Sequence, residues 1–235
     1  MRSAPIFSAD SIGKSFGDRL VLKTASLWAH SGAISVILGR NGCGKSTLFR
    51  IAAGLLAADH GVVRFRDLAW TRPSHRKLAQ LGLFFLPDRN LLSPRRTLQH
   101  HFDALQWYHP DAQVDAAVDR LQLRDHLRKL VRQLSGGERR RAEIAVAIAR
   151  KPACLIADEP LAGISPKDAE EIGEVLYQFA RDGHAVLVSG HEVPQLLSVA
   201  DDVTWMNAGT TVGIGDRLDV RMHDQFQREY LGQWS

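Results

Sequence analysis

The amino-acid sequence predicts an α/β fold, in which a mostly parallel sheet carries helices on both faces. Short apolar runs alternate with helical patterns in both halves of the chain, whereas strand patterns are missing between residues 88 and 150. The 235 residues are 45% hydrophobic and 24% charged, as in an ordinary globular protein with a full core. We therefore expect one domain over residues 1–235, with a core of residues 1–87 and 151–235 and a helical segment of residues 88–150.

The first part of the core is predicted to be rich in strands. Residues 6–33 consist of short apolar runs separated by turns at Phe16-Gly17-Asp18 and His30-Ser31-Gly32. Further along, we expect a buried strand at 34–38, a helix at 45–56, a strand at 62–65 and an apolar run at 81–86 that ends before Pro87.

Helical periodicity dominates the next segment and alternation then returns. We expect the aromatic side chains of Trp107 and Tyr108 to lie in the core of the helical segment. The charges of Arg139-Arg140-Arg141 are expected on the solvated face of a helix. The predicted elements are helices at 97–107, 114–123 and 139–150, a strand at 154–157, a helix at 168–181 and a strand at 185–188.

Charge and cysteine content exclude several classes of protein. The formal net charge is only +4, which is too small a surplus to indicate a nucleic-acid partner. The two cysteines, Cys43 and Cys154, form no disulfide framework or metal-ligand spacing, so a reducing cytoplasm is expected. No signal peptide or membrane-spanning run is recognisable, and any work at a membrane is therefore expected to pass through a partner.

A glycine-rich loop follows the predicted strand at 34–38. Residues Gly39-Arg40-Asn41-Gly42-Cys43-Gly44-Lys45-Ser46 match G-x-x-x-x-G-K-[ST] between a strand and a helix, the arrangement in which backbone N–H groups surround phosphates. Lys45 would contact the terminal phosphates, and Ser46 would bind Mg²⁺. Because a helix N-terminus lowers the pKa of a thiol, Cys43 is expected to be reactive. The predicted nucleotide contacts of this loop are Gly39, Asn41, Gly42, Cys43, Gly44, Lys45, Ser46 and Thr47.

Two adjacent carboxylates follow the apolar strand at 154–157. The carboxyl end of a strand in a parallel sheet is where ligands bind, and Asp158 and Glu159 stand at that end. Asp158 is the expected Mg²⁺ partner, and Glu159 can orient and deprotonate an attacking water.

A third motif narrows the class of nucleotide-binding protein to which the chain can belong. Leu134-Ser135-Gly136-Gly137-Glu138 precedes a long helix and offers a second anion site at a helix N-terminus. With the phosphate loop, the acidic strand and a later His191 in this order, nearly the whole chain resembles the ATP-binding-cassette (ABC) ATPases. In that family the signature of one subunit closes on the ATP held by another. The resemblance implies contacts to a partner's ATP from Ser135, Gly136 and Gly137.

The resemblance carries further expectations. It implies an α/β ABC ATPase core with an N-terminal antiparallel β layer and a helical subdomain. Phe16 would stack on adenine, and His191 would contact the γ-phosphate beside Glu159, with Lys45 as the third catalytic residue. The implied activity is ATP hydrolysis in a dimer around two ATP, coupled to transport through membrane permease subunits at the inner face of the cell membrane.

Two positions depart from the family pattern. Asp88 replaces the usual glutamine after Leu-Pro, so it is expected to bind Mg²⁺ but cannot donate a hydrogen bond when ionised. Ser165 replaces the usual aspartate of a dimer-contact loop. Tyr230-Leu231-Gly232, with the signature region, resembles the lipopolysaccharide-export and branched-chain amino-acid transporter subgroup. A soluble cluster-assembly ATPase and a regulatory subunit with reduced turnover remain as alternatives.

Overall fold

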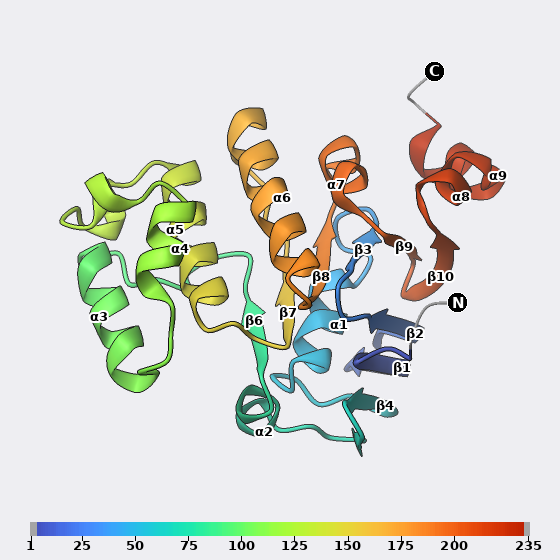
Figure 1. Ribbon diagram of the computed structural model, residues 1–235. Coiled ribbons are helices and arrows are strands. Elements are labelled where there is room, and N and C mark those ends of the chain that lie inside the picture. Colours follow the sequence, from blue (N-terminus) through green and yellow to red (C-terminus); the bar gives the residue numbers. More distant parts are fainter. Residues whose placement is uncertain (1–3, 233–235) are drawn as a thin grey trace.

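A computed structural model describes residues 4–232 and contains one mixed sheet flanked by helices (Figure 1). Ten strands lie in the order β5-β4-β1-β2-β10-β9-β3-β8-β7-β6 in this part of the chain. The strands are β1 (Phe7–Phe16), β2 (Arg19–Ala29), β3 (Ile34–Leu38), β4 (His60–Phe65), β5 (Leu68–Trp70), β6 (Leu83–Leu86), β7 (Cys154–Ala157), β8 (Ala185–Gly190), β9 (Asp202–Asn207) and β10 (Thr210–Gly215). The α-helices are α1 (Lys45–Ala52), α2 (His75–Gln80), α3 (Leu98–Tyr108), α4 (Val114–Arg120), α5 (Gly136–Ala149), α6 (Pro166–Arg181), α7 (Val193–Val199), α8 (Arg217–Met222) and α9 (Asp224–Phe226). Three short helical turns complete the described elements: η1 (Arg124–His126), η2 (Val131–Gln133) and η3 (Gln227–Leu231).

The centre of the sheet is parallel and buried on both faces. Strands β6, β7, β8, β3 and β9 pair in parallel, and every residue of β3, β7 and β8 is buried. Alternate residues serve two separate apolar clusters, with Val36 and Leu38 in one and Ile37 in the other. This period of two explains why the sequence shows a continuous apolar run here, because helices cover both faces of the sheet.

The register of the parallel strands brings their carboxyl ends to one edge. Leu38 of β3 lies opposite Gly190 of β8, and Ala157 of β7 lies opposite Val188 of β8. The residues that follow these strands therefore meet at the same edge, where ligands bind in open parallel sheets.

The N-terminal strands form an antiparallel layer beside the parallel centre (Figure 1). β1 pairs with β2 and β4, and β4 pairs with β5, all antiparallel. A single parallel residue pair, Thr210 with Thr24, joins this layer to β10. The predicted α/β fold with an N-terminal antiparallel layer is confirmed.

Residues 88–150 contain helices and one isolated β-bridge, but no strand. Leu98 and Phe102 of α3 pack into the main apolar cluster. The expectation that Trp107 and Tyr108 lie in the core of this segment is wrong, since these residues are 82% and 77% exposed. Both stand in the last turn of α3, beyond the residues that bury its apolar face.

Local signals decide where the predicted helices begin and end. The helix predicted from residue 139 begins at Gly136, because the Ser135 hydroxyl accepts a hydrogen bond from the Glu138 N–H and caps it. The helix predicted to reach residue 56 ends at Ala52, shortly before the left-handed Gly54. Within residues 4–232, no helix is both long enough and apolar enough to span a membrane.

Candidate functional site

The phosphate loop joins β3 to α1 and has the backbone that its glycines permit. Gly44 precedes α1 with φ of 114°, and a Cβ there would lie 2.8 Å from the Leu22 side chain and 2.9 Å from that of Met206. Only glycine fits both the conformation and the space. The Lys45 side chain is buried, and its ammonium donates hydrogen bonds to the carbonyls of Gly39 at 2.7 Å and Arg40 at 3.3 Å.

A cavity of about 350 Å³ opens over this loop. Phe16 borders it from the end of β1, with 49% of its surface exposed, and the Lys14 ammonium lies 5.4 Å from the centre of its ring. Arg19 and Val21 of β2 also line the cavity and were not singled out from the sequence. The residues lining the cavity are Phe16, Arg19, Val21, Gly42, Gly44, Lys45, Ser46, Thr47 and Glu159.

The Glu159 carboxylate lies between two nitrogen atoms at the edge of this cavity. Its Oε1 is 3.5 Å from Lys45 Nζ, and its Oε2 is 3.4 Å from His191 Nδ1. His191 Nε2 is 3.4 Å from Oε1 of Glu192. The structure therefore brings together the three residues expected to be catalytic: Lys45 at the start of α1, Glu159 just after β7 and His191 just after β8.

Ser189, which sequence reasoning missed, holds the acidic pair. Its fully buried hydroxyl donates to Oδ1 of Asp158 at 2.6 Å and accepts from the Glu159 N–H at 3.1 Å. Asp158 is itself 1% exposed. The sequence does contain a signal for this role of Ser189, because it places a hydroxyl in a buried parallel strand two residues before His191. Such a buried hydroxyl needs a polar partner on a neighbouring strand.

Cys43 differs from the sequence expectation. Burial raises the pKa of its thiol, and the nearby Lys45 charge offsets only part of that effect. The half-buried side chain packs against the apolar cluster of the N-terminal layer, so desolvation outweighs the helix N-terminus. Burial therefore shifts the pKa of Cys43 in the direction opposite to that expected from its position at the helix N-terminus.

The signature residues lie apart from the phosphate loop of the same chain. Ser135 and Glu138 form reciprocal hydrogen bonds, from the Ser135 N–H to Glu138 Oε2 at 2.7 Å and from the Glu138 N–H to the Ser135 hydroxyl at 3.1 Å. The first of these bonds is the main reason why the pKa of Glu138 is lowered. Gly137 allows α5 to approach α6 closely, since a Cβ there would lie 2.3 Å from an oxygen of Asp168. Neither Ser135, Gly136 nor Gly137 lines the cavity over the phosphate loop.

The two positions that depart from the family pattern lie near the signature. Asp88 lines a separate cavity of about 160 Å³ together with Gly136. Its carboxylate is 3.8 Å from Arg89 Nε, a loose ion pair at the surface. Ser165 caps α6 by accepting a hydrogen bond from the Asp168 N–H at 3.1 Å, so the loop expected to contact a second subunit ends in a helix cap.

The three arginines at the start of α5 differ in their surroundings. Arg139 is exposed, as expected, but the Arg141 side chain is 15% exposed and Arg140 only 5%, so the prediction of a solvated charge run is wrong for Arg140 and Arg141. The Arg140 guanidinium lies among backbone carbonyls of the loops after β6 and β7. Helical spacing alone could not reveal these acceptors, because they come from distant parts of the chain.

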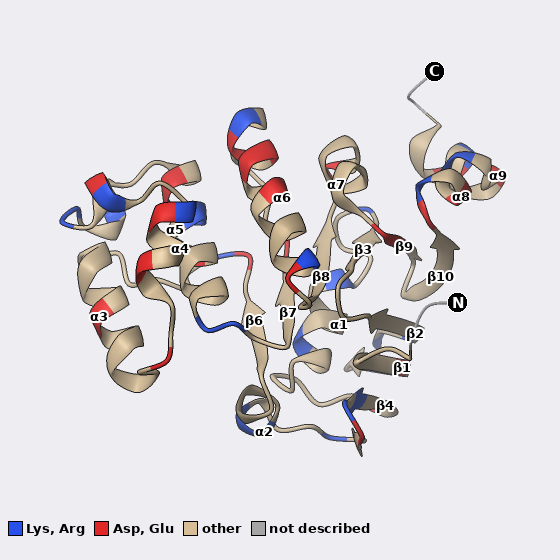
Figure 2. Cartoon of the chain, in the orientation of Figure 1, with Lys and Arg blue, Asp and Glu red and all other residues tan. Residues whose placement is uncertain are grey.

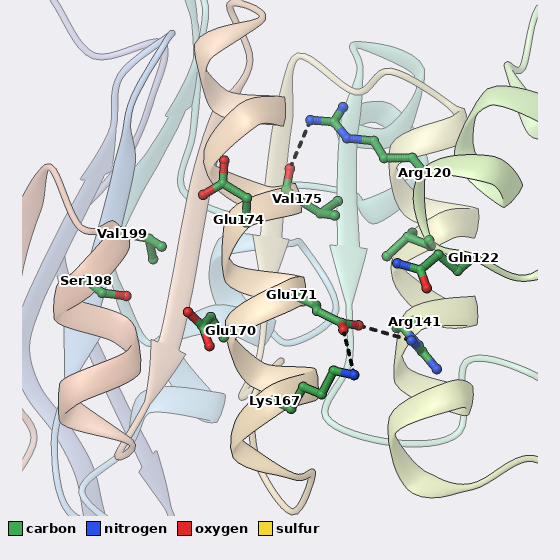
Figure 3. Close-up of a pocket in the computed structure, with 11 residues that line it drawn as sticks. Arg120, Gln122, Arg141, Lys167, Glu170, Glu171, Glu174, Val175, Ser198 and Val199 are labelled. Carbon is green, nitrogen blue, oxygen red and sulfur yellow. Dashed lines mark hydrogen bonds and ion pairs between the residues drawn. The ribbon is translucent and has the colours of Figure 1, made fainter.

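A cavity of about 630 Å³ lies away from the phosphate loop, where α4 and α5 face α6 (Figure 3). Arg141 reaches across from α5 to Glu171 of α6 at 3.1 Å, and Arg120 Nη2 lies 3.5 Å from the Val175 carbonyl. Lys167 also pairs with Glu171, at 3.9 Å. Charges of both signs gather on α5 and α6 (Figure 2), so this cavity is a polar seam between the helical segment and the core.

Comparisons with known proteins agree with this arrangement. The family model described as "ABC transporter" matches residues 22–162. The lipopolysaccharide export system ATP-binding protein LptB of Haemophilus influenzae is 32% identical over 97% of this chain and 98% of its own length. LptB of Escherichia coli strain K12 is 30% identical over 96% of this chain and 97% of its own length.

A solved structure supports the fold. An ATP-binding cassette of an ABC transporter superposes with a TM-score of 0.87 at 22% identity, covering 96% of this chain and 97% of the other. The family match, the full-length relatives and the arrangement of phosphate loop, acidic strand and signature agree. The chain belongs to the ABC transporter family and is one of its ATP-binding, ATP-hydrolysing subunits.

Proposed function

We propose that this chain hydrolyses ATP at the cavity over its phosphate loop, in a dimer that drives membrane permease subunits. The observation that carries the proposal is the position of the Glu159 carboxylate, 3.5 Å from Lys45 and 3.4 Å from His191 at the edge of that cavity. A base, a cation for the terminal phosphates and an imidazole thus converge where a γ-phosphate would lie.

The phosphate loop and Phe16 would hold the nucleotide. The exposed face of Phe16 offers a stacking surface for adenine, and Lys45 would exchange its loop carbonyls for phosphate oxygens. The other expected loop contacts are Gly39, Asn41, Gly42, Cys43, Gly44, Ser46 and Thr47. Such a site takes its affinity from backbone N–H groups and a single fixed charge.

The oxygen donors at the site fit Mg²⁺. The Ser46 hydroxyl lines the cavity, and the buried Asp158 carboxylate already bonds to the Ser189 hydroxyl. Mg²⁺ favours one or two carboxylates together with substrate phosphates, so Ser46 and Asp158 would hold it and the ion would neutralise phosphate charge. Asp88 would join this set when the helical segment moves against the core.

Glu159 would act as the general base. Its carboxylate is set by Lys45 on one side and His191 on the other, so it can accept a proton from a water aligned with the γ-phosphate. His191, 42% exposed at its side chain, can contact the phosphate through a ring nitrogen and keep Glu159 in place.

A second chain would complete each site. Ser135, Gly136 and Gly137 stand at the N-terminus of α5, apart from the cavity of their own chain. Closing two chains head to tail would set each signature on the nucleotide of the other. The dimer would close with ATP and reopen after hydrolysis, because the γ-phosphate is the group that both chains contact.

The membrane partner would select the cargo and place the dimer at the inner face of the cell membrane. The LptB relatives carry the name of a lipopolysaccharide export system, and their similarity extends along the whole chain. We propose integral membrane subunits as the partners here, with the helical segment transmitting the motion of the dimer. Tagged chain should co-purify from detergent-solubilised membranes with a multi-span protein; recovery with soluble proteins alone would contradict this.

The catalytic assignment is tested with Glu159→Gln, with Glu192→Gln as its matched control. Glu159→Gln should lower ATP turnover by about 10²–10⁴-fold and leave a stable dimer in the presence of ATP, because binding survives and hydrolysis does not. Glu192→Gln removes the other carboxylate beside His191 and should change turnover less than about fivefold. Turnover is measured by phosphate release and the dimer by light scattering. A Glu159→Gln chain that stays monomeric with ATP, or turns over normally, would contradict the assignment.

A further inference from the structure

Arg140 is a buried guanidinium whose hydrogen bonds converge on the loop that carries the acidic pair. Its side chain is 6% exposed on the second turn of α5. Nη2 donates to the carbonyls of Asp158 at 3.0 Å and Glu159 at 2.8 Å, and Nε donates to the carbonyl of Pro160 at 2.9 Å. One side chain therefore holds the backbone of three consecutive residues after β7.

The remaining nitrogen of Arg140 reaches the loop after β6 and a carboxylate on its own helix. Nη1 donates to the Pro87 carbonyl at 2.9 Å, immediately before Asp88, and to Oε2 of Glu143 at 2.9 Å. Glu143 is also buried, and the Arg140 charge opposes the rise that burial causes in its pKa. The loop after β6, the loop after β7 and helix α5 thus meet at a single side chain.

The backbone that Arg140 holds is strained. Glu159 has φ of 46°, a left-handed conformation that is unfavourable for a residue with a Cβ. Its N–H donates to the Ser189 hydroxyl at 3.1 Å, and its carbonyl accepts from Arg140 at 2.8 Å. Such conformations persist only where the surroundings over-determine them, and these two contacts bracket the residue.

We propose that Arg140 is a positioning residue that couples the two ATP sites of a dimer. Arg140 holds Glu159 in its own chain, and it stands on α5, the helix whose N-terminus would contact the partner's ATP. The proposal rests on the proposed function, in which Glu159 is the base and Ser135 faces the other nucleotide. Ser135 and Arg140 are separated by little more than one turn of α5, so a shift of the helix at its cap moves the guanidinium too. Hydrolysis at one site then depends on whether the other chain has presented its nucleotide to α5.

The first experiment removes the guanidinium without leaving a buried charge. Arg140→Met combined with Glu143→Met deletes both charges at similar volume, which buried pairs often tolerate. We expect turnover to fall by about 10–100-fold, because small misplacements of a reacting group carry that effect. The Kd for a fluorescent ATP analogue should change less than about threefold and the Hill coefficient for ATP should approach 1, since phosphate-loop binding is untouched while the coupling is lost.

Matched variants separate positioning from general effects of charge. Arg139→Met makes the same substitution at the exposed neighbour and should stay within about twofold of the unchanged protein. Glu143→Gln keeps the carbonyl contacts of Arg140 and should retain most of the turnover. Arg140→Lys should recover part of the turnover, because an ammonium can reach some of the carbonyls. The proposal would be overturned if the double variant lost turnover only in proportion to its loss of ATP affinity. Full turnover in the double variant would overturn it as well.

Mixed dimers with two affinity tags test whether Arg140 acts on its own chain. When the Arg140/Glu143 substitutions and Glu159→Gln share one chain, the unmodified partner should keep one working site, with about half the turnover. When they are on opposite chains, both sites should fail. The reverse pattern would show that Arg140 serves only the signature and would overturn the proposal. An unmodified dimer without turnover, or Glu159→Gln dimers with normal turnover, would instead contradict the proposed function.

Discussion

Replacing Ser189 by alanine removes a hydroxyl that joins two strands at the site. Ser189 donates to Asp158 at 2.6 Å and accepts from the Glu159 N–H at 3.1 Å, inside a fully buried strand. The substitution leaves the carboxylate without a donor and the N–H without an acceptor. No water can replace the hydroxyl easily, because every residue of β8 is buried.

The expected loss in the free energy of unfolding follows from the two hydrogen bonds that Ser189 makes. A hydrogen bond to a charged group contributes about 1.5–3 kcal/mol, and a buried unsatisfied donor costs about 1–3 kcal/mol. The contacts share one oxygen and are not additive, so we expect a loss of about 3 kcal/mol in the free energy of unfolding. For a chain of this size the melting temperature should fall by about 6–12 °C. Turnover should fall at least about tenfold, because both carboxylates lose their orientation.

Ser35→Ala is the matched control. Ser35 lies on the neighbouring strand β3 and is 4% exposed, but its hydroxyl has no hydrogen-bond partner within residues 4–232. Its removal should leave the melting temperature unchanged or slightly raised. Thermal unfolding is followed by circular dichroism and turnover by phosphate release. Equal shifts for the two alanine variants, or a Ser189→Ala protein that melts within about 2 °C of the unchanged chain, would refute the reasoning.

Phe16→Ala should weaken ATP binding by about 5–150-fold and Phe16→Tyr by far less, because stacking on a base contributes about 1–3 kcal/mol; equal titration curves for both would contradict this. Alkylation of Cys43 by iodoacetamide should be slow at pH 7 and still rise about tenfold per pH unit above pH 8.5, because burial raises its thiol pKa; a plateau of the mass-spectrometric rate below pH 8.5 would argue against it. The hydrogen bond from Lys14 holds the pKa of Asp59 below its usual range, so this carboxylate stabilises the fold above its unfolded pKa and loses that effect as pH falls through the lower folded value. Asp59→Asn should therefore be less stable than the unchanged chain at pH 7, and the two should converge below about pH 4 in denaturant titrations; a constant gap would contradict the assignment.

The local sequence pattern was sufficient to predict an element where the residues of a single segment determine its structure. The strands at 34–38 and 154–157 were predicted with the bounds that the structure has, because each is a short apolar run stopped by glycine or carboxylates. The spacing of the phosphate loop requires no knowledge of the rest of the fold. The start of α5 is predicted three residues late, although Ser135 with Glu138 three residues further on is a capping pattern visible in the sequence.

The missed features depend on pairing between distant segments. Ser189 matters only because β8 lies beside β7, and that neighbour is known only from the assembled sheet. Arg140 is chemically identical to the exposed Arg139, and its burial follows from carbonyls that arrive from two distant loops. Trp107 was misplaced for the opposite reason, since Leu105 packs against the main apolar cluster whereas Trp107, two residues further on, is 82% exposed.

The cavity over the phosphate loop is bordered by both parts of the sheet, so a nucleotide bound there would contact both. Phe16 and Arg19 border the cavity from the antiparallel layer, whereas Lys45 belongs to the parallel centre. β2 meets β10 at the parallel pair Thr210 with Thr24, and the N–H groups of Lys23 and Ser26 donate to the Gly209 carbonyl and the Thr211 hydroxyl on either side of it. A bound nucleotide stacked on one part and anchored by its phosphates in the other would cross-brace them. Filling the cavity would thus add a polar link between two parts that already share one apolar cluster, which holds both Leu22 of β2 and Ile37 of β3.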